Sequence, residues 1–173
     1  ACQHSSQYFQ LSHLLGVDKE IGLTTNNIKI PFTVSGKHFI LEDVEGEIDF
    51  DQDINNIFVL SQDTTVLSEK DGSVRIATNT FGKGQSIYLS GFKFAPENTR
   101  LLHRCLYFAA DRESEYGPWT SSNFNTDCAF YPNTKKLVVI SSSDKPEKTK
   151  VFTADGKSIE VRLEPHGIRL LDL

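Results

Sequence analysis

Five short β-type segments separated by turn residues fill the last third of the chain, and they constrain its fold more than any other feature. The segments are DCAFY, KLVVIS, TKVFTA, SIEVRL and GIRLLDL, and the turns between them are PNTK, SDKPEK, DGK and EPHG. Runs of this length, bounded by Pro, Gly, Asn and Asp, are typical of strands joined by tight turns. They predict a small antiparallel β-sandwich at the end of the chain.

The composition changes in the segment DRESEYGPWTSS, where charged residues give way to Gly117, Pro118 and then serines. Such a segment is typical of a boundary between domains. We therefore predict a domain over residues 1–115 and the β-sandwich domain over residues 116–173.

The segment SVRIATNTFGKGQSIYLSGF raises the question of a phosphate-binding loop, because two glycines flank Lys83. A P-loop requires Ser or Thr directly after Gly-Lys, and here Gly84 follows; a dinucleotide loop leads from a strand into a helix. Here alternating apolar residues both precede and follow the glycines, so a β-hairpin is the preferred prediction over a phosphate loop.

Two helices are predicted in the first domain. Residues 5–15 have helical spacing and end at Gly16, and Pro96 begins a second helix with an apolar stripe. We expect HFILED and NIFVLS to be short strands and residues 24–36 to be a loop around Pro31. The stripe consists of Leu101, Leu102, Cys105, Leu106 and Ala109. A helix after strands favours an α/β layer of which the chain carries only the later elements.

Composition excludes several classes of function. The chain has 173 residues, is 38% hydrophobic and carries a net charge of −5, so it can bury a core but has no basic surface for nucleic acid or an anionic membrane. The first residues lack a signal peptide, and the apolar run CLYFAA is too short to span a bilayer. The odd set of three cysteines favours a reducing compartment, and a cytoplasmic location is expected.

A start at Ala1 and the lack of methionine indicate a piece of a longer protein.

No residue pattern makes a convincing active site. The five histidines show no metal-ligand spacing, and Cys105, which follows His103 by two positions, lies on an apolar helix stripe where an inert buried thiol is usual. The acidic segment LEDVEGEIDFDQD could supply a glycosidase pair or a calcium site, but a solvated face is the preferred interpretation. Trp119 could stack on a sugar, although an aromatic plug between domains is the preferred role. We predict no catalytic, cofactor-binding or metal-ligating residue.

Several longer strings resemble one enzyme family in order and spacing over nearly the whole chain. They include FQLSHLLGVDKE, HFILEDVEGEIDF, SGFKFAPENTRLL, PWTSSN and LEPHGIRLLDL. The strings FQLSHLLGVDKE and SGFKFAPENTRLL are the more telling, because general folding rules do not require them. The chain resembles the bacterial 1,3-β-galactosyl-N-acetylhexosamine phosphorylases, also called galacto-N-biose or lacto-N-biose phosphorylases.

The resemblance implies the later part of a glutamine amidotransferase-like α/β domain followed by the β-sandwich. In this family an N-terminal (β/α)8-type barrel carries the acid and most sugar and phosphate contacts. The implied reaction is inverting phosphorolysis, with inorganic phosphate as co-substrate, to α-galactose 1-phosphate and free N-acetylhexosamine. No catalytic residue of the family can be carried over to this chain, so it is expected to be inactive alone. The resemblance implies the barrel as its partner and leaves a homodimer open.

Two other classes of function stay open at this point. The chain could be a stand-alone carbohydrate-binding or interaction module that uses Trp119 and the β-rich tail. It could also be an accessory region of a β-galactosidase-type hydrolase, which shares a similar central domain. Dependence of product formation on phosphate separates the hydrolase from the phosphorylase.

Overall fold

The computed structural model describes residues 8–22, 29–42, 44, 48–93 and 95–173 of the chain. It divides into two units, one comprising residues 1–94 and 101–113 and the other residues 95–100 and 114–173. Pairing between the named strands is antiparallel in both units. The described part is therefore β-rich, and the narrower expectation of an amidotransferase-like α/β domain stays a prediction.

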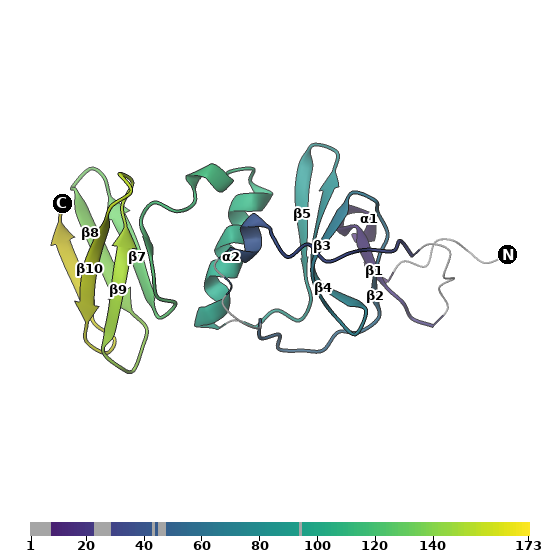
Figure 1. Cartoon of the computed structure of the whole chain (residues 1–173), viewed down its shortest axis with the longest axis horizontal. Coiled ribbons are helices and arrows are strands. Elements are labelled where there is room, and N and C mark those ends of the chain that lie inside the picture. The colour runs from purple at the N-terminus through teal and green to yellow at the C-terminus, as the bar shows by residue number, and fades with distance from the viewer. Residues whose placement is uncertain (1–7, 23–28, 43, 45–47, 94) are drawn as a thin grey trace. The chain divides into compact units, whose positions relative to one another are not determined.

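The first unit is built on a three-stranded sheet in the order β3-β4-β5. Strand β4 is the central strand, and its residues from Ser73 to Asn79 are all buried. In Figure 1 the sheet lies between α2 on one side and α1 with the β1-β2 pair on the other. The elements are α1 (Ser12–Leu15), β1 (Val17–Lys19), β2 (Ile57–Val59), β3 (Thr64–Lys70), β4 (Ser73–Phe81), β5 (Gly84–Leu89) and α2 (Pro96–Ala109), of which residues 101–109 belong to this unit.

Two apolar clusters hold this unit together. One joins β1 and β2 to the sheet through Val17, Ile57, Val59, Val66, Val74, Ala77 and Tyr88. The other joins the sheet to α2 and the 3-10 helix Phe39–Leu41 through Ile40, Leu67, Ile76, Leu101 and Cys105. Burial of one aliphatic side chain is worth about 1.5–3 kcal/mol, against about 0–1 kcal/mol for an exposed ion pair. The clusters, and not the surface ion pairs, therefore stabilise the unit.

Two local predictions for this unit were wrong. The expected helix over residues 5–15 is only Ser12–Leu15 in the described part, because the Asp18 carboxylate binds the backbone N–H groups of Tyr8 and Phe9; residues 5–7 lie outside the described residues. Within the segment HFILED, Phe39–Leu41 form a 3-10 helix instead of a strand, and His38 Nδ1 accepts the Ile40 N–H at 3.2 Å.

The second helix begins at Pro96 as predicted but has a different buried face. Leu101, Arg104 and Cys105 are buried, whereas Leu106 is 59% exposed and Ala109 is also exposed. Arg104 replaces Leu106 on the inner face because its guanidinium reaches the Phe39 carbonyl and the Glu42 carboxylate, each at 2.9 Å. A prediction from the spacing of apolar residues cannot identify a buried arginine whose charge is paired.

The second unit is a sandwich of two three-stranded sheets, in the orders β10-β9-β6 and β11-β8-β7. All five strands predicted in the tail are present, with β6 as a short addition. Leu137, Val139, Val151, Val161 and Leu163 fill the space between the sheets. The strands are β6 (Thr120–Ser121), β7 (Thr126–Tyr131), β8 (Lys136–Ser141), β9 (Glu147–Phe152), β10 (Ser158–Leu163) and β11 (Ile168–Asp172).

Gly16 is a position where the fold requires glycine. Its φ is +71°, and a Cβ atom there would lie 2.0 Å from Thr64 Oγ1 and 2.6 Å from Asn79 Cγ. Both side chains are held in place, since Thr64 donates to the Gly16 carbonyl at 3.1 Å and Asn79 donates to the Leu14 carbonyl at 2.8 Å.

We predict that Gly16→Ala lowers the free energy of unfolding by about 3 kcal/mol, from the left-handed backbone and the overpacking together. Gly72→Ala is the matched control, because Gly72 has φ +76° but open space around its Cβ position. It should cost only about 1 kcal/mol. Urea denaturation of the chain measures both, and equal losses would contradict the packing argument.

Candidate functional site

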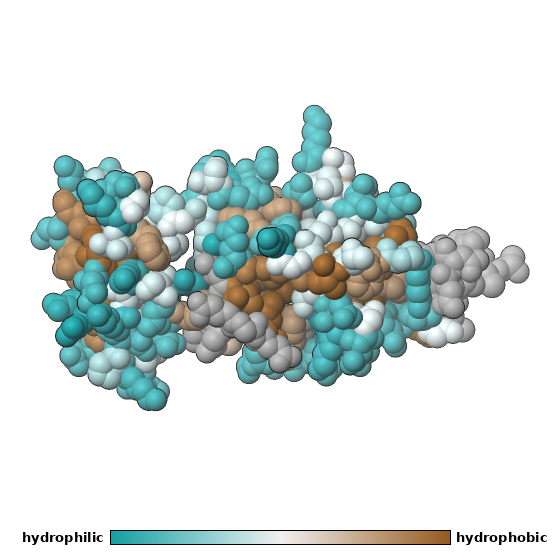
Figure 2. Space-filling view, viewed as in Figure 1, coloured by the Kyte–Doolittle hydropathy of each residue, from teal (hydrophilic) through white to brown (hydrophobic). Residues whose placement is uncertain are grey.

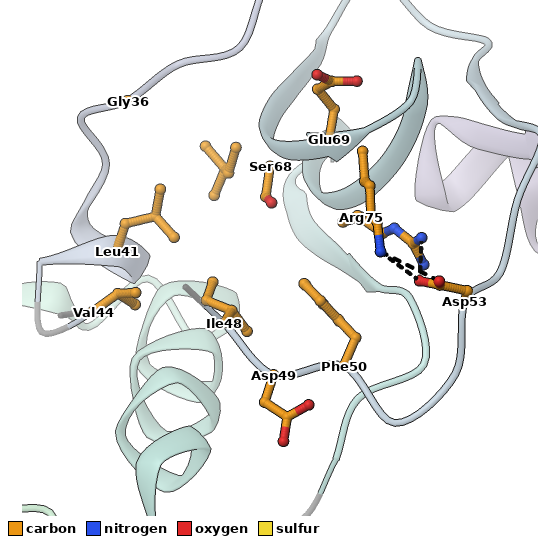
Figure 3. Close-up of a pocket in the computed structure, with 12 residues that line it drawn as sticks. Gly36, Leu41, Val44, Ile48, Asp49, Phe50, Asp53, Ser68, Glu69 and Arg75 are labelled. Atoms are coloured by element: carbon orange, nitrogen blue, oxygen red, sulfur yellow. Dashed lines mark hydrogen bonds and ion pairs between the residues drawn. The ribbon is translucent and has the colours of Figure 1, made fainter. Parts of the chain in front are cut away.

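The first unit contains a pocket of about 720 Å³ between the segment 36–53 and strands β3 and β4. Leu41, Val44 and Ile48 line one side, and Arg75 and Asp53 meet on the opposite side (Figure 3). Phe50 and Asp49 also line the pocket. The pocket thus combines an apolar wall with carboxylates, and its chemistry depends on whether those carboxylates are available to a ligand.

Arg75 dominates the polar side of the pocket. The residue is 1% exposed on the central strand β4, and its Nη2 donates to Asp53 Oδ1 at 2.7 Å. Its Nη1 donates to the Gln52 carbonyl at 3.4 Å, and the guanidinium lies 5.8 Å from the centre of the Phe50 ring. A buried charge requires such compensation. Arg75 therefore fixes the segment 50–53 against the sheet.

Asp53 accepts from two cations. Besides Arg75, the Lys70 ammonium approaches its two carboxylate oxygens at 3.4 and 3.3 Å. Lys70, with a further contribution from Arg75, holds the pKa of Asp53 below its usual value. The carboxylate is thus kept ionised and committed to structural partners, which disfavours a role as a general acid.

We predict that Asp53→Asn lowers the thermal unfolding midpoint at pH 7 more than Asp49→Asn does. The second substitution removes an ion pair between half-exposed side chains, Lys93 and Asp49 at 2.6 Å. The pKa of Asp53 is lower in the folded chain than in the unfolded chain. Its carboxylate therefore stabilises the folded state fully above the ordinary carboxyl pKa of about 4. This stabilisation is lost as the pH falls from that value through the lowered pKa of the folded chain.

The difference in midpoint between wild type and Asp53→Asn should therefore shrink in acid. Thermal scans between pH 7 and pH 3 measure it. A difference that stayed constant with pH would show that the carboxylate charge is not the stabilising feature.

The described carboxylates of the acidic segment are largely exposed to solvent, which agrees with the predicted solvated face, and several of them also form ion pairs. Glu42 binds Arg104 at 2.9 Å, Asp49 binds Lys93, and Asp53 binds Arg75 and Lys70. Asp43, Glu45 and Glu47 lie outside the described residues. Within the described part of the chain, no group of three His, Cys, Asp or Glu side chains is placed to hold a metal ion.

The Cys-His combination considered from the sequence does not form. His103 is exposed on α2, whereas Cys105 is buried on its inner face, and burial raises the pKa of the Cys105 thiol to about 12. Cys128 donates to the Trp119 carbonyl at 2.9 Å, and burial raises the pKa of its thiol to about 11. Neither thiol is a nucleophile, because nucleophilic attack needs the thiolate.

We predict that Cys105 and Cys128 resist iodoacetamide at pH 8 in the folded chain. A thiol with a pKa near 11 is only about one thousandth ionised at that pH. The same chain in urea is the control, where both thiols should react at the ordinary rate. Mass spectrometry reports the modified residue, and alkylation of folded Cys105 at the unfolded rate would contradict its burial.

The other residues singled out from the sequence also have structural contacts. Trp119 stacks on Phe130 with ring centres 3.9 Å apart, so Phe130 covers one face of the indole. The GKG segment is the tight turn between β4 and β5, where Phe81 pairs with Gly84 and Gly82 has φ +63°. The hairpin prediction is confirmed.

The pocket itself was not predicted. The one signal in the sequence was an arginine inside the apolar run SVRIA, where a buried charge implies a partner from elsewhere in the chain. That signal locates Arg75 but does not identify Asp53 as its partner. In the described part of the chain, no helix has the length and apolar character needed to cross a bilayer.

These features define a β-rich protein of two units whose described charges and thiols are largely engaged within the fold. The model of the lacto-N-biose phosphorylase central domain matches residues 1–114, and that of the lacto-N-biose phosphorylase C-terminal domain matches residues 119–171. The chain therefore belongs to the lacto-N-biose phosphorylase family.

Three similar proteins are named 1,3-β-galactosyl-N-acetylhexosamine phosphorylases. Two 1,3-β-galactosyl-N-acetylhexosamine phosphorylases of Lachnoclostridium phytofermentans are 37% and 36% identical over 97% and 96% of this chain. The enzyme of the same name from Bifidobacterium longum subsp. longum is 31% identical over 95% of the chain. The chain spans only about a quarter of their length, namely 23%, 23% and 26%.

Proposed function

We propose that this chain is the central and C-terminal part of a disaccharide phosphorylase, and that it supports a catalytic domain located elsewhere in the polypeptide. The whole enzyme would cleave galactosyl-β1,3-N-acetylhexosamine with inorganic phosphate. The observation that carries the proposal is 37% identity over 97% of the chain to a phosphorylase of that specificity. The amidotransferase-like fold of residues 1–115, the boundary near residue 115 and a cytoplasmic location are parts of the same proposal.

The proposed reaction replaces one bond to the anomeric carbon by another. A phosphate oxygen attacks C1 of galactose from the face opposite the leaving group, and the C1–O bond to the N-acetylhexosamine breaks. A carboxylic acid protonates the departing oxygen, giving α-galactose 1-phosphate and the free sugar. Such an acid needs a raised pKa, whereas the pKa of Asp53, which lines the pocket, is lowered. This supports placing the acid outside the chain.

The proposal also concerns partners. An N-terminal barrel domain of the same polypeptide would bind the sugar and phosphate, and this chain would stabilise it. A homodimer is a further proposal that the same relatives do not decide. No cofactor is proposed beyond phosphate as co-substrate.

We predict that the full-length enzyme releases a sugar phosphate from galactosyl-β1,3-N-acetylglucosamine only when phosphate is present, and that this chain alone releases none. Chromatography of the products with and without phosphate measures both. Free galactose formed independently of phosphate would indicate a hydrolase and contradict phosphorolysis.

A matched variant tests the supporting role. Asp49→Asn in the full-length enzyme removes a carboxylate of the pocket, and kcat should stay within about twofold of wild type because the side chain takes no part in the bond exchange. Turnover by this chain alone, or loss of kcat in Asp49→Asn without loss of folding, would place catalytic groups in this region.

A further inference from the structure

One outer face of the β-sandwich is apolar. Residues directly opposite each other in an antiparallel sheet point to the same side. The register of β7, β8 and β11 therefore places three rows of three residues on the face turned away from the sandwich core. The rows are Asp127-Ile140-Ile168, Ala129-Val138-Leu170 and Tyr131-Lys136-Asp172.

The large apolar side chains of these rows are exposed. Ile168 is 67% exposed, Leu170 57%, Tyr131 54% and Ile140 43%. Figure 2 shows hydrophobic surface at the edge of this unit where β11 lies in Figure 1. A single exposed leucine is ordinary. Several on adjacent positions of one sheet face are typical of a surface that another protein surface covers.

The outer face of the other sheet gives an internal comparison. There Lys148 pairs with Arg162 and Lys150 with Glu160 across β9 and β10, and Lys148 also forms an ion pair with Glu160 at 2.9 Å. This is the charged outer face expected of an antiparallel sheet in water. The outer face of β9 and β10 thus carries paired charged side chains, whereas the outer face of β7, β8 and β11 carries exposed apolar side chains.

The few charges on the apolar face are largely neutralised. Lys136 binds Asp172 at 2.6 Å, which leaves Asp127 at the opposite corner. Apolar surfaces with little charge are characteristic of permanent interfaces, whereas transient ones are more polar. A permanent partner is available if the chain belongs to a longer enzyme, since it covers only 23% of the length of its relatives.

We propose that the outer face of β7, β8 and β11, hereafter the β11 face, docks onto the N-terminal part of the same phosphorylase polypeptide. The inference rests on the proposed function, because that function supplies the missing domain. The β11 face would bury its apolar residues against this domain and hold the C-terminal unit to it.

Thiol labelling tests the inference. Ile168→Cys places a thiol on the β11 face, and Lys150→Cys places one on the charged face as the matched control. Each variant is made in this chain and in the full-length enzyme, and a maleimide is added at micromolar protein. Mass spectrometry of the peptide that carries the new thiol gives the labelling rate, so native cysteines do not interfere.

The thiol at position 168 should react at least about tenfold more slowly in the full-length enzyme than in this chain, because labelling then requires local opening. The thiol at position 150 should react equally fast in both. Leu170→Cys repeats the test at a second position if Ile168→Cys fails to fold, and circular dichroism checks folding.

Equal labelling of position 168 in both proteins would overturn the inference. Slow labelling of position 168 in this chain as well would also overturn the inference. If that labelling rate rose on dilution of the protein, a second copy of the chain would be the occupant of the β11 face. If the rate did not change with protein concentration, the first unit would be the occupant. A phosphate-dependence assay on the Lys150→Cys enzyme tests the proposed function separately, because that substitution lies off the β11 face.

Discussion

The first unit depends on the polar residues of a strand that is buried on both sides. Strand β4 separates two apolar clusters, and its Arg75 and Asn79 are almost fully removed from solvent. Buried polar groups are costly unless they are hydrogen-bonded. Asn79 meets this need by binding the Leu14 carbonyl, and Arg75 by binding Asp53. These two residues therefore fix the end of α1 and the segment 50–53 to one sheet, and Arg75 also lines the pocket.

The same constraint determines the pairing of the charged groups that line the pocket. Its most deeply buried charge, Arg75, neutralises Asp53, and Lys70 adds a second cation to that carboxylate. A general acid would need a carboxyl group that burial keeps protonated. The two thiols of the described residues are equally unsuited, because burial raises the pKa of both Cys105 and Cys128. Family membership and these local properties together support a structural role in a larger enzyme.

The sequence predicted those parts of the fold that follow from local patterns. The five strands of the tail, the β4-β5 hairpin and the start of α2 at Pro96 all follow from alternation, glycine and proline. Contacts between distant residues could not be predicted, such as Asp18 with the backbone of Phe9 or Arg104 with Glu42. For the same reason the pocket was missed, since Asp53 and Arg75 meet only after the sheet forms. The β11 face was equally invisible, because alternation identifies two faces of a strand but not which one another domain covers.

We propose that this chain supports catalysis without binding the reacting groups. Titration of the isotopically labelled chain with galactosyl-β1,3-N-acetylglucosamine and phosphate, followed by NMR, tests it most directly. The account predicts that the amide signals of residues 48–53 and of Arg75 do not shift at millimolar ligand. Saturable shifts of these signals would show that the pocket binds substrate and would contradict the account.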